Sequence, residues 1–165
     1  MIHRLVDFAL RQRLVIIGSG QDEARLRSLA GPTIHFLGWQ PDEAIRDHFR
    51  RCRALIFPGE EDFGIVPVEA NACGTPVIAF GRGGATETIV PLGGREAPSG
   101  VWFMEQGVEC LIEAIEHFAK SEHAFPAAML RRRALQFTSS RFERELFAYI
   151  DNIVCPQAAP LHLAA

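Results

Sequence analysis

Short apolar runs, each stopped by a glycine, a proline or polar residues, are the feature that most constrains the fold of this chain. Such runs are typical of buried strands, and stretches with helical periodicity separate them. Strands that are apolar throughout and alternate with helices predict a parallel sheet covered on both faces. The sequence therefore predicts an α/β, Rossmann-like fold. The runs are Leu14–Ile17, Thr33–Leu37, Ala54–Phe57, Val77–Phe80 and Gly100–Phe103.

The carboxyl ends of these runs indicate where a ligand would bind, because open parallel sheets bind ligands outside those ends. Gly18, Gly38, Pro58 and Gly81 follow the first four runs, so their loops should converge on one crevice. The first loop also resembles the start of a dinucleotide fingerprint. However, Glu23 occupies the position of its third glycine, which disfavours a NAD site.

The loop after the third run combines the features of a phosphate-binding turn. Pro58 and Gly59 end the strand, and Gly64 allows a sharp turn. Pro67 suits the first position of a helix because it has no N–H to leave unpaired. The free amides around Ile65 and Val66 should then point out of a helix N-terminus, which favours anions, phosphate above all.

Two carboxylates bracket this turn, Glu61 and Glu69, with seven residues between them. A carboxylate can accept two hydrogen bonds from a vicinal diol, so the pair could hold a sugar on one side and a ribose on the other. The alternative is a solvated acidic loop, Glu60-Glu61-Asp62, with Glu69 complementing the helix dipole.

The residues that follow carry a resemblance to a known family. Gly74-Thr75-Pro76-Val77-Ile78 leads from a short helix into a strand, and Gly83-Gly84-Ala85-Thr86-Glu87 forms a second glycine-rich loop. Together with the two spaced glutamates, this order resembles the donor-binding motif of the retaining glycosyltransferases called group 1 or family 4, which have the two-domain GT-B architecture. The sequence around Glu61 is most similar to that of the mannosyltransferase branch.

The resemblance implies a role for each matching position. Glu61 would contact the transferred hexose and is the candidate catalytic residue, with the backbone of Phe63 and Gly64 beside the sugar. The amides of Ile65 and Val66 would hold the diphosphate.

At the other end of the donor, Glu69 would bind the ribose hydroxyls, and Gly38 and Trp39 would flank the base. The resemblance implies a nucleotide diphosphate sugar as donor substrate, with no metal and no further cofactor.

The resemblance runs from about Leu14 to Ile153, which corresponds to the second, donor-binding half of a complete GT-B enzyme. The family places an Arg and a Lys on a loop after the first strand of this half, and the ten residues between Arg4 and Val15 leave no room for that loop and a full helix. We therefore expect the chain to begin inside the helix that follows a missing first strand, with a helical remainder over residues 2–12. That strand would be central, so its loss should expose ladder groups and apolar surface.

At 165 residues the chain fits one globular domain, which we place at 1–155, followed by a flexible tail at 156–165. Its 17 Lys+Arg and 20 Asp+Glu leave a net charge of −3, so no basic field recruits nucleic acid. Arg131-Arg132-Arg133 is predicted to be a solvated helix face rather than a nucleic-acid patch. No apolar run approaches the roughly 20 residues of a membrane span.

The cysteines, Cys52, Cys73, Cys110 and Cys155, show no paired spacing, and no signal-like segment precedes them. We expect reduced thiols in a cytoplasmic protein that at most lies at a membrane surface. His48 and Cys52 stand one helical turn apart, but packing is favoured over a shared metal ion.

The resemblance implies the donor-binding half of a glycosyltransferase that moves a hexose to an acceptor hydroxyl and is inactive alone, its acceptor domain coming from another polypeptide. The alternative is a non-catalytic remnant or interaction module with the same fold. GT-B epimerases and phosphorylases are disfavoured by the spacing of the two glutamates.

Overall fold

The computed structural model describes residues 12–94 and 96–154, and its strands form two parallel sheets. In the first sheet, β1 (Leu14–Ile17) pairs with β2 (Ile34–Gly38), Leu14 lying opposite Ile34. In the second, β4 (Val77–Phe80) lies between β3 (Leu55–Phe57) and β5 (Gly100–Phe103). The α/β, Rossmann-like class is confirmed. The difference from the prediction is that the sheet is divided, because β1 and β3 are not hydrogen-bonded to each other.

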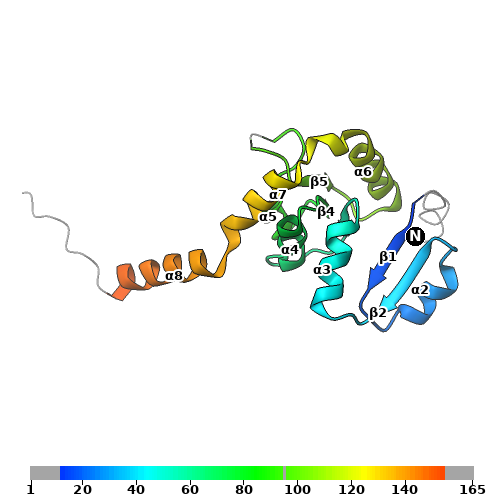
Figure 1. Cartoon of the computed structure of the whole chain (residues 1–165), viewed down its shortest axis with the longest axis horizontal. Helices are drawn as coiled ribbons and strands as arrows, with labels where there is room; N and C mark the ends of the chain where they lie inside the picture. The colour runs from blue at the N-terminus through cyan, green and yellow to red at the C-terminus, as the bar shows by residue number, and fades with distance from the viewer. Residues whose placement is uncertain (1–11, 95, 155–165) are drawn as a thin grey trace, which may run out of the picture.

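Helices connect and cover the strands (Figure 1). The predicted helical remainder at residues 2–12 and the predicted tail at 156–165 lie almost wholly outside the described residues. The helices are α2 (Glu23–Leu29), α3 (Asp42–Arg51), α4 (Ile65–Cys73), α5 (Ala85–Thr88), α6 (Val108–Ser121), α7 (Ala127–Ala134) and α8 (Ser139–Val154), with 3-10 turns η1 (Glu122–Ala124) and η2 (Leu135–Phe137).

The core surrounds the second sheet, and alternate residues of β4 divide it into two layers. Ile78 and Phe80 pack with Leu111 and Phe118 of α6. Val77 and Ala79 point to the opposite face and pack in one cluster with Phe49 of α3 and with Ala70 of α4. All of β4 is buried, as a strand covered on both faces should be.

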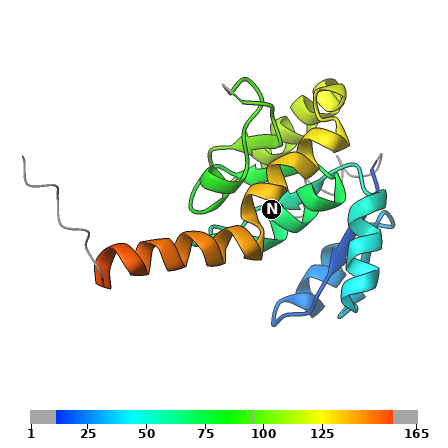
Figure 2. The ribbon, with the colours of Figure 1, turned by 60° about the vertical axis from the view of Figure 1, so that its left-hand side comes forward.

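The first sheet is much less covered. No residue from Gln12 to His48 is buried, although β1 is as apolar as β4. Figure 2 shows this β1–α2–β2 unit to one side of the main body, with α3 beside it. The apolar character of β1 is therefore not matched by the cover that it receives here.

The last helix, α8, projects away from the main body (Figure 1). Its apolar side chains include Phe142, Phe147 and Ile153, which are 65%, 63% and 61% exposed. Among the residues that the structure describes, no helix combines the length and apolar character needed to cross a membrane.

Candidate functional site

The predicted turn forms at the N-terminus of α4. Gly64 caps the helix with φ 78° and ψ 70°, a left-handed conformation that residues other than glycine rarely adopt. The helix begins at Ile65, so Pro67 occupies its third position rather than the predicted first. The prediction of its place was wrong by one half-turn, but the reason for its presence holds, since the amides of the first turn have no partner within the helix.

An open pocket of about 500 Å³ lies at this helix start, lined by the contiguous segment from Glu60 to Val66. The structure thus brings together Glu61, Phe63, Gly64, Ile65 and Val66, all predicted from the sequence. The side chains of Ile65 and Val66 are exposed, which leaves the start of the helix open to solvent.

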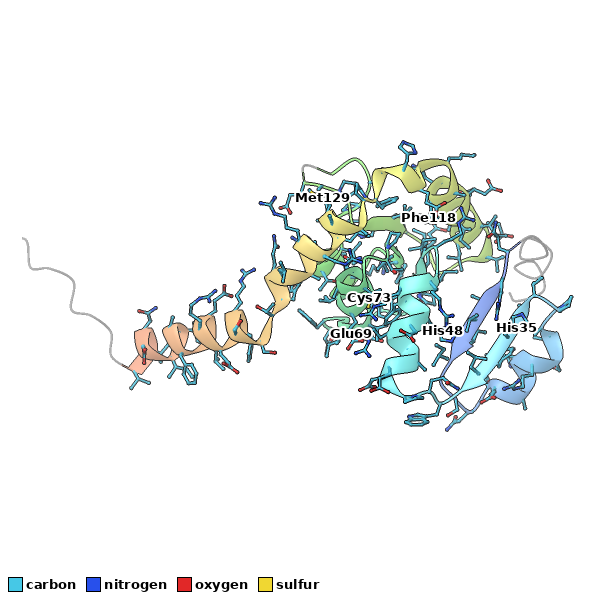
Figure 3. The ribbon with its side chains drawn as sticks, in the orientation of Figure 1. His35, His48, Glu69, Cys73, Phe118 and Met129 are labelled. Carbon is cyan, nitrogen blue, oxygen red and sulfur yellow. The ribbon has the colours of Figure 1, made fainter. Side chains whose placement is uncertain are left out.

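Three other predicted residues do not line this pocket. Glu69, predicted in the first turn of the helix, is the fifth residue of α4, and its side chain is exposed (Figure 3). Gly38 ends β2 with φ 66°, and Trp39 beyond it is 78% exposed. Their roles toward a ribose and a base stay predictions.

The second glycine-rich loop supports the pocket from behind. The Gly84 N–H donates to the Glu61 carbonyl oxygen at 2.7 Å. A Cβ added at Gly84 would lie closer than 3.0 Å to backbone atoms of Phe63, and one at Gly83 equally close to the Glu61 carbonyl oxygen. Glycine is required at both positions because the two loops touch backbone to backbone.

Arg133 fixes the far side of this second loop. Its guanidinium donates to the carbonyl oxygens of Glu87 at 2.6 Å and Thr88 at 3.2 Å, and its side chain is only 16% exposed. Arg131 likewise donates to the Cys73 carbonyl oxygen at the end of α4, at 3.2 Å. The predicted solvated face is therefore wrong for Arg133, which serves as a structural tie.

Phe137 and Gln106, which the sequence analysis did not identify, hold the loop between β3 and α4. The ring of Phe137 meets that of Phe63 edge to face, with centroids 5.8 Å apart, while the Arg133 guanidinium lies 5.3 Å from the Phe137 ring centroid. Gln106 donates a hydrogen bond to the Pro58 carbonyl oxygen at 3.0 Å. No local pattern reveals such ties, because their partners are a ring and a backbone carbonyl far away in the chain.

The chemistry offered at the pocket is that of amides and carboxylates. The lining includes Glu60, Glu61 and Asp62 and no basic side chain. Within residues 12–94 and 96–154, no group of three or more His, Cys, Asp or Glu side chains could hold a metal ion. The pocket can therefore accept hydrogen bonds from hydroxyl groups at the acidic loop and hold an anion at the start of α4.

Comparison with known proteins adds a family. The family model described as glycosyl transferases group 1 matches residues 5–136, which is more than half of the chain. Among curated proteins, a GDP-mannose-dependent alpha-mannosyltransferase of Mycolicibacterium smegmatis is 30% identical over 157 residues, covering 93% of this chain and 40% of the relative. A GDP-mannose-dependent alpha-(1-6)-phosphatidylinositol dimannoside mannosyltransferase of Mycobacterium tuberculosis is 30% identical over 147 residues, covering 87% and 37%.

Solved structures of glycosyltransferases share the fold. A glycosyltransferase from Rickettsia africae matches with a TM-score of 0.77 at 19% identity, over 93% of this chain and 43% of that one. HepE from Anabaena, in complex with UDP-glucose, matches with a TM-score of 0.70 at 21% identity, over 90% and 44%. The chain thus spans less than half the length of these relatives and structures.

Proposed function

Because the chain belongs to the glycosyl transferases group 1 family, we propose that it is the part of a retaining hexosyltransferase that binds the nucleotide diphosphate sugar. The observation that carries this proposal is the pocket at the N-terminus of α4, where Gly64 turns the chain and the Glu61 loop lies beside the first turn of the helix. The free amides and the dipole of a helix N-terminus together stabilise each negative charge placed there by about 0.3–1 kcal/mol.

Within this proposal each predicted residue has one task. Glu61 receives hydroxyl groups of the hexose, the backbone of Phe63 and Gly64 lies along the sugar, and Ile65 and Val66 donate amide hydrogen bonds to the diphosphate. Glu61 lies on the loop that Gly84 and Phe137 support, and the Gly84 N–H holds its backbone carbonyl.

The remaining residues of the proposed site act on the nucleoside. Glu69 holds the ribose, and Gly38 and Trp39 contact the base. The two relatives described above are GDP-mannose-dependent by name, which favours mannose as the hexose and guanine as the base for this chain too. No metal or further cofactor takes part in this proposal.

The same pocket suggests that the chain needs more polypeptide for transfer. A departing nucleoside diphosphate carries several negative charges, yet the pocket lining is acidic and has no cation to stabilise them. We propose that an acceptor domain and the neutralising charges come from polypeptide beyond this sequence. The second candidate, a nucleotide-binding module without transferase activity, is favoured by the same missing cation.

The location of the proposed reaction follows from the donor and the acceptor class. One matched relative acts, by its name, on a phosphatidylinositol dimannoside, an acceptor with a lipid anchor. We propose that the complete protein works in the cytoplasm at a membrane surface.

The test is titration calorimetry of the full chain with GDP, UDP and GDP-mannose. We expect Gly64→Val to abolish nucleotide binding, whereas Gly93→Val, the matched control with φ 85° in a loop away from the pocket, should retain it. Glu69→Gln should weaken free nucleotide by about 1–2 kcal/mol, and Glu61→Gln should weaken only the nucleotide-sugar. Equal binding by the Gly64 and Gly93 variants would overturn the proposed site.

A radiolabelled donor assay separates the two candidate functions. The chain alone should release and transfer no sugar above background, because losing each preorganised charge contact slows catalysis by about 10²–10³. Transfer that appears when an acceptor-domain polypeptide is added supports the transferase half. Nucleotide binding without transfer under every such condition supports the binding module.

A further inference from the structure

We propose that Phe137 is a positioning residue for the sugar half of the donor, and that it acts through the ring of Phe63. The inference rests on the proposed function, because it names the end of the bound nucleotide diphosphate sugar that depends on Phe137. Phe137 belongs to the 3-10 turn η2, whereas Phe63 belongs to the loop between β3 and α4, here called the pocket loop.

The first observation is the place of Phe63. It lines the pocket, its side chain is 43% exposed, and it directly precedes Gly64, the left-handed cap of α4. A ring in such a place gains little orientation from its own segment, because glycine permits several backbone conformations. A contact from another segment is therefore needed to keep the Phe63 ring in one position at the pocket.

The second observation is the contact that orients this ring. The ring centroids of Phe63 and Phe137 are 5.8 Å apart and the ring planes are 73° apart, which is the edge-to-face arrangement that aromatic pairs prefer. The attraction depends on the angle between the rings as well as on their distance. Phe137 therefore restricts both the direction and the place of the Phe63 ring.

The third observation is that Phe137 is itself held from outside the pocket. The Arg133 guanidinium lies 5.3 Å from the Phe137 ring centroid. The same guanidinium donates to the carbonyl oxygens of Glu87 and Thr88 at the end of α5, and to the Gln136 Oε1 at 2.7 Å. Arg133 thus joins η2 to α5, and Phe137 is oriented by this junction.

The fourth observation is that these contacts form a closed path around the pocket loop. Gly84, just before α5, donates its N–H to the Glu61 carbonyl oxygen and lies against the Phe63 backbone. The path runs from the pocket loop to Gly84, along α5 to Arg133, and through Phe137 back to Phe63. The loop is therefore held from two sides, its backbone by Gly84 and its exposed ring by Phe137.

The fifth observation separates the two ends of the proposed donor. The free amides proposed to hold the diphosphate belong to α4, and this helix has anchors of its own. Ala70 and Asn71 are buried, and the Asn71 side-chain amide donates to the carbonyl oxygens of Thr75 at 2.9 Å and Ser99 at 3.3 Å. Loss of the Phe137 ring should therefore disturb the sugar end of the site and leave the diphosphate end in place.

Titration calorimetry of the full chain with GDP and with GDP-mannose tests the inference. Phe137→Ala should raise the dissociation constant for GDP-mannose by roughly three- to tenfold, as expected for one lost aromatic pair, and change that for GDP by less than about twofold. A merely structural role would change both constants by one factor, or neither. Phe137→Tyr keeps the ring and should restore the affinity for GDP-mannose.

The matched control is Leu135→Ala, because Leu135 stands in the same 3-10 turn and its side chain is 66% exposed. This variant should bind both ligands as the parent does. In a Phe63→Ala chain, adding Phe137→Ala should cause no further loss, since two changes that remove one contact are not additive. If Phe137→Ala does not fold by circular dichroism, Phe137→Leu, which keeps an apolar side chain without the ring, should show the same selective loss.

The outcomes distinguish this inference from the proposed function. Equal affinity of the parent and the Phe137 variants for GDP-mannose, equal weakening of GDP and GDP-mannose, or full additivity with Phe63→Ala would overturn the inference alone. A parent that binds GDP but not GDP-mannose would also overturn it, because no sugar would then be held. A parent that binds neither ligand would overturn the proposed function, and this inference with it.

Discussion

The two sheets of this chain are built from similar strands in dissimilar surroundings. Ile16 is the third residue of β1 and Ile78 the second of β4, and both strands are four-residue apolar strands of a parallel ladder. Yet Ile78 is 2% exposed, whereas Ile16 is only half-buried. Helices α3, α4 and α6 cover the second sheet, whereas no residue of the β1–α2–β2 unit is buried. An apolar strand sequence thus indicates that the strand is stable when buried. It does not show that the rest of the chain buries it.

The difference also separates rigid from adaptable parts of the proposed site. We call the β1–α2–β2 unit the first region, and the second sheet with its covering helices the second region. The pocket loop is held by the second region, through Gly84, Gln106 and Phe137. Gly38 and Trp39, proposed to contact the base, belong to the first region, which has few buried contacts. We therefore expect the diphosphate and hexose end of the site to be preorganised, and the base end to become ordered only when the first region is fully covered.

The largest expected effect comes from exchanging the matched isoleucines for alanine. Ile78→Ala should lower the free energy of unfolding by about 2–5 kcal/mol, because it leaves a cavity in a closed core. Ile16→Ala should lower it by about 1 kcal/mol or less, since its environment is already half solvent. Urea denaturation followed by circular dichroism measures both. Similar losses for the two variants would show that the first region is as well packed as the second.

The next effect concerns matched glycines, one in each region. At Gly84 a Cβ would meet the Phe63 backbone, whereas at Gly20 nothing lies within 4 Å, and neither position has a positive φ. Gly84→Ala should therefore destabilise the protein by about 1–3 kcal/mol through overpacking, and Gly20→Ala should stay within about 0.5 kcal/mol of the parent. Thermal unfolding of the two variants checks this. A neutral Gly84→Ala would mean that the loops move apart at little cost.

These residues also show what the sequence could and could not reveal. The strands, the α/β class and the turn at Gly64 were predictable, because apolar runs, glycine and proline act through their own backbone and close neighbours. The tie made by Arg133 was not, since its partners are carbonyl oxygens of Glu87 and Thr88, and any residue carries a carbonyl. The division of the sheet was likewise beyond a local pattern, because strand pairing depends on which segments are present to pair.

A smaller effect is expected at Arg133 itself. Arg133→Gln removes charged hydrogen bonds to two carbonyl oxygens and the contact with the Phe137 ring, and should cost about 1–2 kcal/mol of stability. Arg132→Gln, an exposed neighbour on the same helix, should change stability by less than about 0.5 kcal/mol. Amide exchange at Phe63 should accelerate only in the first variant. Unchanged exchange there would show that Arg133 stabilises α7 without reaching the pocket loop.

The smallest effect tests Arg53, whose side chain hydrogen-bonds to a residue beside the first sheet. Arg53 donates to Gln12 beside β1 and forms an ion pair with Glu122, its Nη2 lying 2.5 Å from the Glu122 Oε2. That hydrogen bond, and then the attraction between the charges, lowers the pKa of Glu122 below its ordinary value and raises that of Arg53. Because the folded-state pKa of Glu122 is lowered, the stabilisation is present above the ordinary carboxyl pKa and is lost as pH falls through the lowered one.

Glu122→Gln should therefore cost only about 0.2–1 kcal/mol at neutral pH, as exposed pairs do, and nothing in strong acid. Glu116→Gln, an exposed change on α6, is the control. If Arg53 holds the first region in place, Glu122→Gln should also speed amide exchange at Leu14 but not at Ile78. Equal exchange at Leu14 in parent and variant would show that the two regions are oriented by α3 alone.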